Sequence, residues 1–257
     1  MKTGFAAFLK KEWTELARSG RLLILLVMFL LFGIMNPAIA KLTPWLMEQM
    51  AEQLAEAGLS VSAVAVDAKT SWAQFYKNIP MAVLLFAVLF GGCLSNECER
   101  KTLIPLLSRG LSRRSVIGAK ALLISLVWTG GYWLCFGVTF AYNAFFWGSE
   151  GAAGAFVPAL FPWLFGLWLI SMLFLFSAFA RTGTAVLAGL AVLLICCFTA
   201  GMLPDAARWL PTKLLSVQAL AAGQEETAEF VRASISAAVS GGLGYFVALL
   251  GFERRLL

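Results

Sequence analysis

Long apolar runs and short charged segments alternate along this chain. Six long stretches contain no Asp, Glu, Lys or Arg, and the charged residues gather between them. A helix needs roughly 20 apolar residues to cross the hydrocarbon core of a bilayer, and a charge at its centre costs about 2.5–3.5 kcal/mol. A soluble bundle would instead carry polar residues on an outer face at helical spacing, which these stretches lack. The pattern predicts an all-α, polytopic membrane protein with six transmembrane helices, at about residues 22–40, 79–96, 116–141, 157–180, 183–203 and 232–252.

Residues 4–18 have the pattern of an amphipathic helix. Large apolar side chains recur there every three to four residues, and lysines lie between them. The apolar residues are Phe5, Phe8, Leu9, Trp13 and Leu16. Aromatic residues on one face and lysines on the other are typical of a helix that lies in the membrane interface. We therefore expect an N-terminal interfacial helix before the first span.

Two longer polar segments, 41–77 and 204–231, fall on the side of the predicted membrane opposite the N-terminus. Within the first, residues 45–57 combine one polar face with one apolar face. This pattern fits either a helix on the outer leaflet or a lid on an external opening. Asn36-Pro37 predicts a kink near the end of the first span. Aromatic residues before the second span predict an anchor at the membrane surface; they are Trp72, Phe75 and Tyr76.

Composition and charge add the orientation. Apolar residues make up 60% of the chain and charged residues 13%, and the mean hydropathy is +0.83. Soluble domains hold about 25% charged residues. With six spans, most of the 20 Lys and Arg residues fall on the side that holds both termini. Cytoplasmic segments of membrane proteins carry such an excess, so we expect both termini in the cytoplasm. The net charge of +6 then follows from the topology and indicates no nucleic-acid partner.

The residue types that most enzyme sites need are missing. The chain has no His, which excludes His-based metal sites and Ser-His catalysis, and no Gly-Lys-Ser/Thr, which excludes a P-loop. Its two aspartates, Asp67 and Asp205, fall outside the predicted spans, and its five cysteines lie in or beside spans, which indicates no disulfide framework. The spans are also expected to lack the buried acids and bases of ion-coupled transporters. We expect no catalytic residue, cofactor or metal site.

One compact charged segment, residues 97–114, interrupts the apolar middle of the chain. Acidic and basic residues flank a run of leucines, which predicts a short helix with apolar side chains and a charged rim. Such a helix fits a groove on a soluble partner; the other interpretation is a basic anchor on the inner leaflet, and the two can coexist. The candidate contact residues are Glu97, Glu99, Arg100, Thr102, Leu103, Leu106, Leu107 and Arg113.

Small residues recur along the last predicted span. Gly241, Gly244 and Ala248 are three and four residues apart, so they share one helix face. Such a face lets a second helix approach closely. That helix belongs either to the same subunit or to a second copy.

The sequence ERKTLIPLLSRGLSRRSVIGAK, residues 99–120, resembles the cytoplasmic segment of ABC-2 type permeases, the membrane subunits of a class of ABC exporters. In that family a Glu precedes Gly-Thr-Leu, and paired leucines, a Ser, a Pro, Ser-Arg and a Lys entering the third span follow. Lys101 stands where the family usually has the Gly, and Gly110 where it has the Pro. The residues that match are Glu99, Thr102, Leu103, Leu106, Leu107, Ser108, Ser112, Arg113 and Lys120. LKKEW at 9–13 and QFYKNIP at 74–80 resemble the first helix and the entry to the second span, so the resemblance extends over the chain.

The resemblance implies a permease subunit in the plasma membrane of a bacterium, with a separate ABC ATP-binding subunit docked on residues 97–114. Two permease subunits, as a homodimer or a heterodimer, would enclose the pathway in the lipid bilayer. ATP hydrolysis would take place in the partner, so the chain itself is expected to be no enzyme. The alternatives are a membrane-anchored sensor or self-protection (immunity) subunit that transports nothing, and a passive channel. The sequence does not indicate the cargo.

Overall fold

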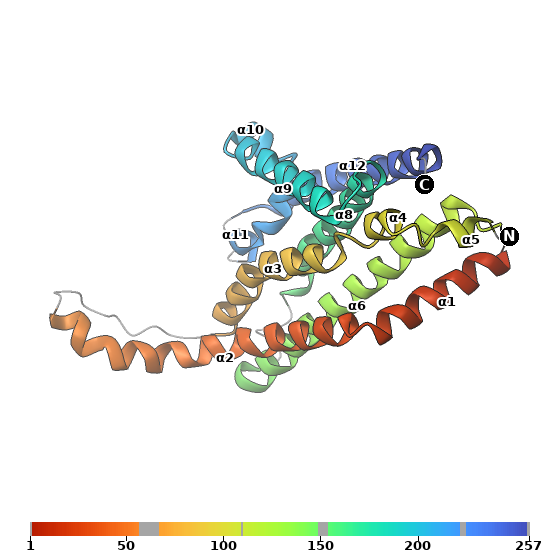
Figure 1. Cartoon of the computed structure of the whole chain (residues 1–257). Coiled ribbons are helices and arrows are strands. Elements are labelled where there is room, and N and C mark those ends of the chain that lie inside the picture. The colour runs from red at the N-terminus through yellow and green to blue at the C-terminus, as the bar shows by residue number, and fades with distance from the viewer. Residues whose placement is uncertain (1, 57–66, 109, 149–153, 222–224, 256–257) are drawn as a thin grey trace.

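A computed structural model describes residues 2–56, 67–108, 110–148, 154–221 and 225–255 (Figure 1). Every regular element in these ranges is a helix, and six stretches are long and apolar enough to cross a membrane by length and composition. The helices are α1 (Lys2–Arg18), α2 (Arg21–Glu56), α3 (Ala68–Phe90), α4 (Ser95–Glu99), α5 (Ile104–Ser108), α6 (Arg113–Trp147), α8 (Phe156–Phe179), α9 (Gly183–Ala200), α10 (Pro204–Ala207), the 3-10 helix η1 (Pro211–Leu215), α11 (Val217–Ala221) and α12 (Thr227–Arg254). The six spans are α2, α3 with α4, α6, α8, α9 and α12. The predicted fold class is confirmed.

The first span continues far beyond its predicted end. α2 is one helix of 36 residues, or about 54 Å at 1.5 Å per residue. This length exceeds the thickness of a hydrocarbon core, which is about 30 Å. The second half of α2 extends past the other helices, at the left of Figure 1. Residues 45–56 therefore continue α2 and do not form a separate helix; residue 57 lies outside the described residues.

The second span begins earlier than predicted, at Ala68. Asp67 caps this start, since one of its carboxylate oxygens accepts a 3.0 Å hydrogen bond from the backbone N–H of Thr70. The prediction that Trp72, Phe75 and Tyr76 form a membrane-surface anchor is wrong, because all three rings are buried in the protein. Trp72 and Phe75 contact aromatic residues of α6; the ring centroid of Trp72, for example, lies 5.1 Å from that of Phe136.

Aromatic side chains also fill the space where α2, α3, α6 and α8 meet. The indole of Trp128 has no exposed surface, and its centroid lies 5.2 Å from Phe86 and 6.0 Å from Phe29. Its Nε1 donates a 3.0 Å hydrogen bond to the carbonyl of Trp163 on α8. The ring therefore satisfies its one polar group while contributing a large apolar contact area.

A hydrogen bond from a neighbouring helix compensates for the proline within α2. Pro37 has no N–H, so the carbonyl of Gly33, four residues earlier, loses its helical donor. The hydroxyl of Thr139 on α6 donates a 3.0 Å hydrogen bond to this carbonyl, and Thr139 is fully buried. An unsatisfied backbone group is costly inside a bilayer. Thr139 thus replaces, from a neighbouring helix, the bond that Pro37 removes.

We expect T139V, which keeps the side-chain shape but removes the hydroxyl, to lower the free energy of unfolding by roughly 1 kcal/mol. In a P37A background the same change should cost clearly less, because the N–H restored at position 37 reaches the Gly33 carbonyl. Reversible unfolding of the four variants in mixed detergent micelles measures this coupling. Equal costs of T139V in both backgrounds would contradict the role given to Thr139.

The small-residue face of α12 packs on α8. Gly241 and Gly244 are buried, and Ala248 has no exposed surface. A Cβ added at Gly244 would lie 2.5 Å from Cε of Met172, and one at Gly241 would lie 3.4 Å from Cδ1 of Trp168. The face is therefore filled by a helix of the same chain and is not open to a second copy.

Both ends of the described chain lie at one end of the bundle, together with α4 and α5 (Figure 1). Hydrogen bonds from Arg113 to the last turn of α12, and the proximity of Leu111 to Gly4, place the same segments together. We call this end of the molecule the terminal end.

Candidate functional site

Residues 97–114 fold as two short helices instead of the single one predicted. α4 ends at Glu99, a turn follows, and α5 begins at Ile104. Lys101 in that turn has a φ of 56°, a left-handed conformation that costs a residue with a Cβ about 1–2 kcal/mol. Glycine, which the resemblance implies at this position, takes this conformation without that cost. Gly110 has a φ of 89°, which a proline could not adopt.

Three of the residues expected to contact a partner face inward. Leu103 is 1% exposed and lies in the hydrophobic core. Glu97 pairs with Lys120, and Arg113 donates to the carbonyls of Phe252 and Glu253, both at 3.1 Å, and to that of Arg255. Packing and hydrogen bonds within the chain occupy these three side chains, so they are not free to form an exposed contact surface, and their part in coupling stays a prediction.

The other expected contact residues remain available. Glu99, Arg100 and Thr102 are exposed, and so is the neighbouring Ile104; we call these four residues the docking face. Leu106 and Leu107 are half-buried and pack against the core. A cleft of about 480 Å³ between α1 and residues 92–106 adjoins the docking face, with Arg100 and Thr102 among its lining residues.

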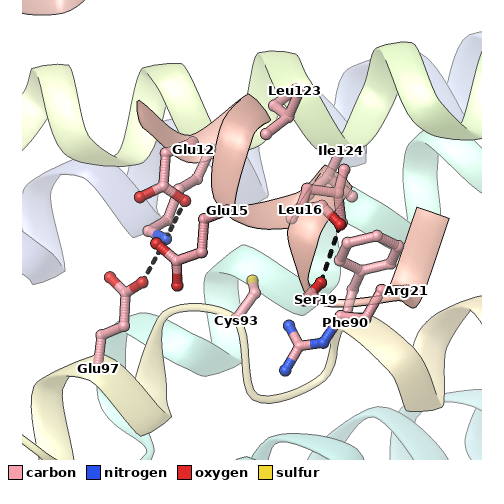
Figure 2. A pocket seen from close by; sticks show the side chains of 11 residues that line it. Glu12, Glu15, Leu16, Ser19, Arg21, Phe90, Cys93, Glu97, Leu123 and Ile124 are labelled. Atoms are coloured by element: carbon pink, nitrogen blue, oxygen red, sulfur yellow. Dashed lines mark hydrogen bonds and ion pairs between the residues drawn. The ribbon is translucent and has the colours of Figure 1, made fainter. Parts of the chain in front are cut away.

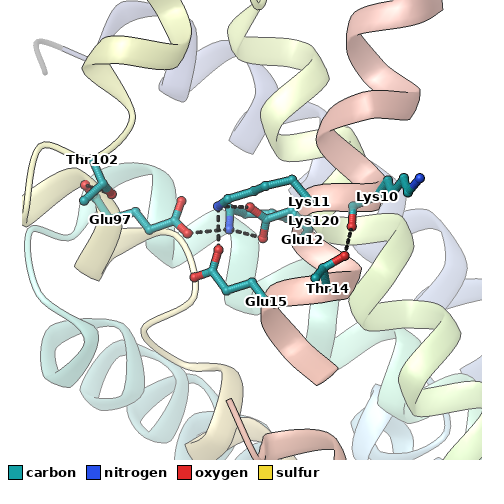
Figure 3. Close-up of polar contacts among 8 residues, drawn as sticks. All are labelled: Lys10, Lys11, Glu12, Thr14, Glu15, Glu97, Thr102 and Lys120. Atoms are coloured by element: carbon teal, nitrogen blue, oxygen red, sulfur yellow. Dashed lines mark hydrogen bonds and ion pairs between the residues drawn. The ribbon is translucent and has the colours of Figure 1, made fainter. Parts of the chain in front are cut away.

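A buried lysine joins three helices next to this segment. Nζ of Lys120 on α6 lies 2.5 Å from a carboxylate oxygen of Glu12 on α1 and 2.8 Å from one of Glu97 on α4 (Figure 3). The side chains of Lys120 and Glu12 are 4% and 8% exposed, and that of Glu97 is 19% exposed. We call these three residues the lysine clamp. Because Lys120 lies in a span, the expectation that the spans lack buried acids and bases is wrong at the terminal end.

Two further charges adjoin the clamp. Lys11 lies 2.9 Å from Glu12 and 2.6 Å from Glu15, all on α1. The hydrogen bond from Lys11 lowers the pKa of Glu15; partial burial alone would lower the pKa of Lys11, but its hydrogen bonds to Glu15 and Glu12 raise it. At neutral pH both groups are therefore charged.

The acidic groups are close enough to hold a cation. Ligand atoms of Glu12, Glu15 and Glu97 lie within 4.8 Å of one another and border a cavity of about 110 Å³ (Figure 2). The ammonium groups of Lys11 and Lys120 already lie between these carboxylates (Figure 3). The arrangement is therefore an ion-pair network in which lysines take the place that a metal ion would need.

Sequence reasoning missed the clamp, although a signal was present. Glu12 lies four residues after Phe8 and four before Leu16, so it falls on the buried stripe of α1 and not on the polar face. That stripe packs along α6, so α1 covers another helix at the terminal end. An acid in the centre of an apolar stripe predicts a buried basic partner.

Polar contacts also connect the segment to the second half of the bundle. The side-chain oxygen of Asn96 on α4 accepts a 3.2 Å hydrogen bond from the N–H of Gly183, at the start of α9. Arg113 caps the end of α12, while Arg255 donates to the carbonyls of Ser177 and Ala180 at the end of α8, both at 2.7 Å. Cations at helix C-termini are favoured by the helix dipole and satisfy unpaired carbonyls.

Comparison with known proteins decides the family. The sequence model described as "ABC-2 family transporter protein" matches residues 6–239, nearly the whole chain. The chain belongs to the ABC-2 family of transporter proteins. Among its relatives, the uncharacterized transmembrane protein YxlG of Bacillus subtilis (strain 168) is 24% identical over 217 residues, which cover 81% of this chain and 81% of YxlG.

Membership in the ABC-2 family agrees with the six apolar helices and identifies a multi-pass membrane protein of the permease type.

The two aspartates of this ABC-2 protein have positions that suit structural roles. Asp67 caps α3, and Asp205 lies in the first turn of α10. The interactions at the candidate site are the ion pairs and hydrogen bonds between helices described above.

Proposed function

We propose that this chain is the membrane-spanning permease subunit of an ATP-driven exporter, coupled through residues 97–114 to a separate ATP-binding subunit. Two permease subunits form the translocation pathway, and ATP hydrolysis takes place in the partner. The cell is a bacterium, and both termini, with α4 and α5, lie on the cytoplasmic side of its plasma membrane. This orientation follows from the excess of Lys and Arg on that side.

The observation that carries the proposal is the division of the segment into two faces. The docking face is exposed and mixes charged, polar and apolar groups, as the contact surfaces of soluble partners do. On the other face, Glu97, Asn96 and Arg113 are held by α6, α9 and α12. A basic membrane anchor would not need these contacts, whereas a segment that passes motion from a partner to the spans does.

Affinity purification from mild detergent tests the proposal. We expect the tagged chain to retain a protein with a nucleotide-binding domain, in a particle that holds two permease and two ATP-binding subunits. Mass spectrometry identifies the partner, and light scattering gives the mass of the particle. An active, monodisperse particle with a single permease chain and no ATP-binding subunit would contradict the proposal and favour a sensor or self-protection subunit.

A further inference from the structure

The lysine clamp is an unusual feature for the end of a membrane span. Two carboxylates and one ammonium group leave water there, and removing them from water costs so much that buried ion pairs add little net stability. Apolar side chains of similar size would hold the helices together equally well or better. The charges therefore call for an explanation beyond stability.

What charged groups add is a specific position for α4. This helix has five residues and no side-chain cap at its start, so it cannot keep its place through its own backbone. Glu97 ties α4 to Lys120 on α6, and the same ammonium group ties α6 to Glu12 on α1. Since α1 leads into α2 after Ser19 and Gly20, the clamp connects α4 with the beginnings of the first and third spans.

We infer that Lys120 is a positioning residue that makes α1, α4 and the start of α6 move as one body, so that a force on the docking face reaches α2 and α6. The inference rests on the proposed function for the source of that force, which is nucleotide binding by the partner subunit. The joining of the three helices does not rest on it, and can be measured on the permease alone.

Hydrogen exchange of the purified permease tests the joining of the helices. K120M removes the ammonium group and keeps a side chain of similar length, and we expect exchange in α1 and α4 to become at least about tenfold faster while exchange in α8 and α12 is unchanged. K213M is the matched control. Lys213 also lies between two glutamates, 2.8 Å from Glu225 and 3.7 Å from Glu229. These residues lie near the start of α12, away from the terminal end. Unchanged exchange in α1 and α4 of K120M would overturn the inference.

A second variant separates positioning from stability. E12Q/E97Q/K120M removes all three charges together, so it leaves no buried unpaired charge and should fold even if K120M does not. We expect this variant to bind the ATP-binding subunit as the unmodified chain does. The change in exchange of α2 and α6 caused by a non-hydrolysable ATP analogue should, however, fall at least about fivefold.

The outcomes differ between the two proposals. If E12Q/E97Q/K120M keeps the full nucleotide-dependent change, the clamp only stabilises the fold, and the inference is overturned. If the unmodified chain binds no ATP-binding subunit at all, the proposed function fails, while exchange in the permease alone still decides whether Lys120 joins α4 to α1.

Discussion

Replacing Gly166 by Ala should lower the free energy of unfolding by about 2–3 kcal/mol, although it adds only one methyl group. A Cβ at this position of α8 would overlap atoms of the buried Trp128 indole. The ring cannot move aside easily, since it packs against Phe29 and Phe86 and its Nε1 bonds the carbonyl of Trp163. Unfolding in mixed micelles measures the loss, and changed tryptophan fluorescence should accompany it.

Gly137 provides the control for this substitution. It also lies within a span, α6, but a Cβ added there meets no atom within 4 Å. We expect G137A to leave stability unchanged or to raise it by up to about 1 kcal/mol, because Ala favours the helix more than Gly does. Similar losses in G137A and G166A would show that contact with Trp128 is not the cause.

Charge reversal on the docking face should release the ATP-binding subunit without unfolding the permease. E99R changes an exposed carboxylate that makes no ion pair among the described residues. We expect at least about tenfold weaker binding of the partner, or roughly 1.4 kcal/mol, because a like-charged pair replaces a complementary one. The measurement is the amount of ATP-binding subunit retained per permease, together with the unfolding free energy of the permease alone.

Two variants complete this experiment. E48R makes the same change at an exposed position on the extended half of α2 and should leave binding unchanged. L103A should instead destabilise the permease itself. Because Leu103 is buried, we expect its unfolding free energy to fall by about 2–5 kcal/mol. Normal retention of the partner by E99R would remove the docking face from the proposal.

The spans could be predicted because charge is excluded from them. The predicted start at 157 and the observed start at Phe156 differ by one residue, and the predicted and observed starts of the fifth span coincide at Gly183. Predictions failed where polar residues continue a helix beyond its apolar stretch. Nothing in the local pattern distinguishes α2 running on to Glu56 from a break followed by a new amphipathic helix.

The contact of residues 97–114 with a partner stays a prediction, and the sequence did not predict how this segment folds. Charge density indicated residues 97–114, and the exposed Glu99 and Arg100 agree with a contact surface. Glu97 and Leu103 lie on either side of a turn at Lys101, whose left-handed backbone is not the preference of a lysine. Glu12 and Lys120 also belong to the site. The local sequence pattern did not predict their contact, because the two residues lie far apart in the sequence.

The order of the clamp residues along the chain has a consequence for biosynthesis. Glu12 and Glu97 precede Lys120 in the chain, so both countercharges are synthesised before the lysine with which they pair. α6 is the least hydrophobic of the six spans, and its lysine adds to the difficulty of partitioning into lipid. The early segments α1 and α4 can neutralise that lysine as it arrives. We therefore expect the N-terminal part of the protein to favour the insertion of its own third span.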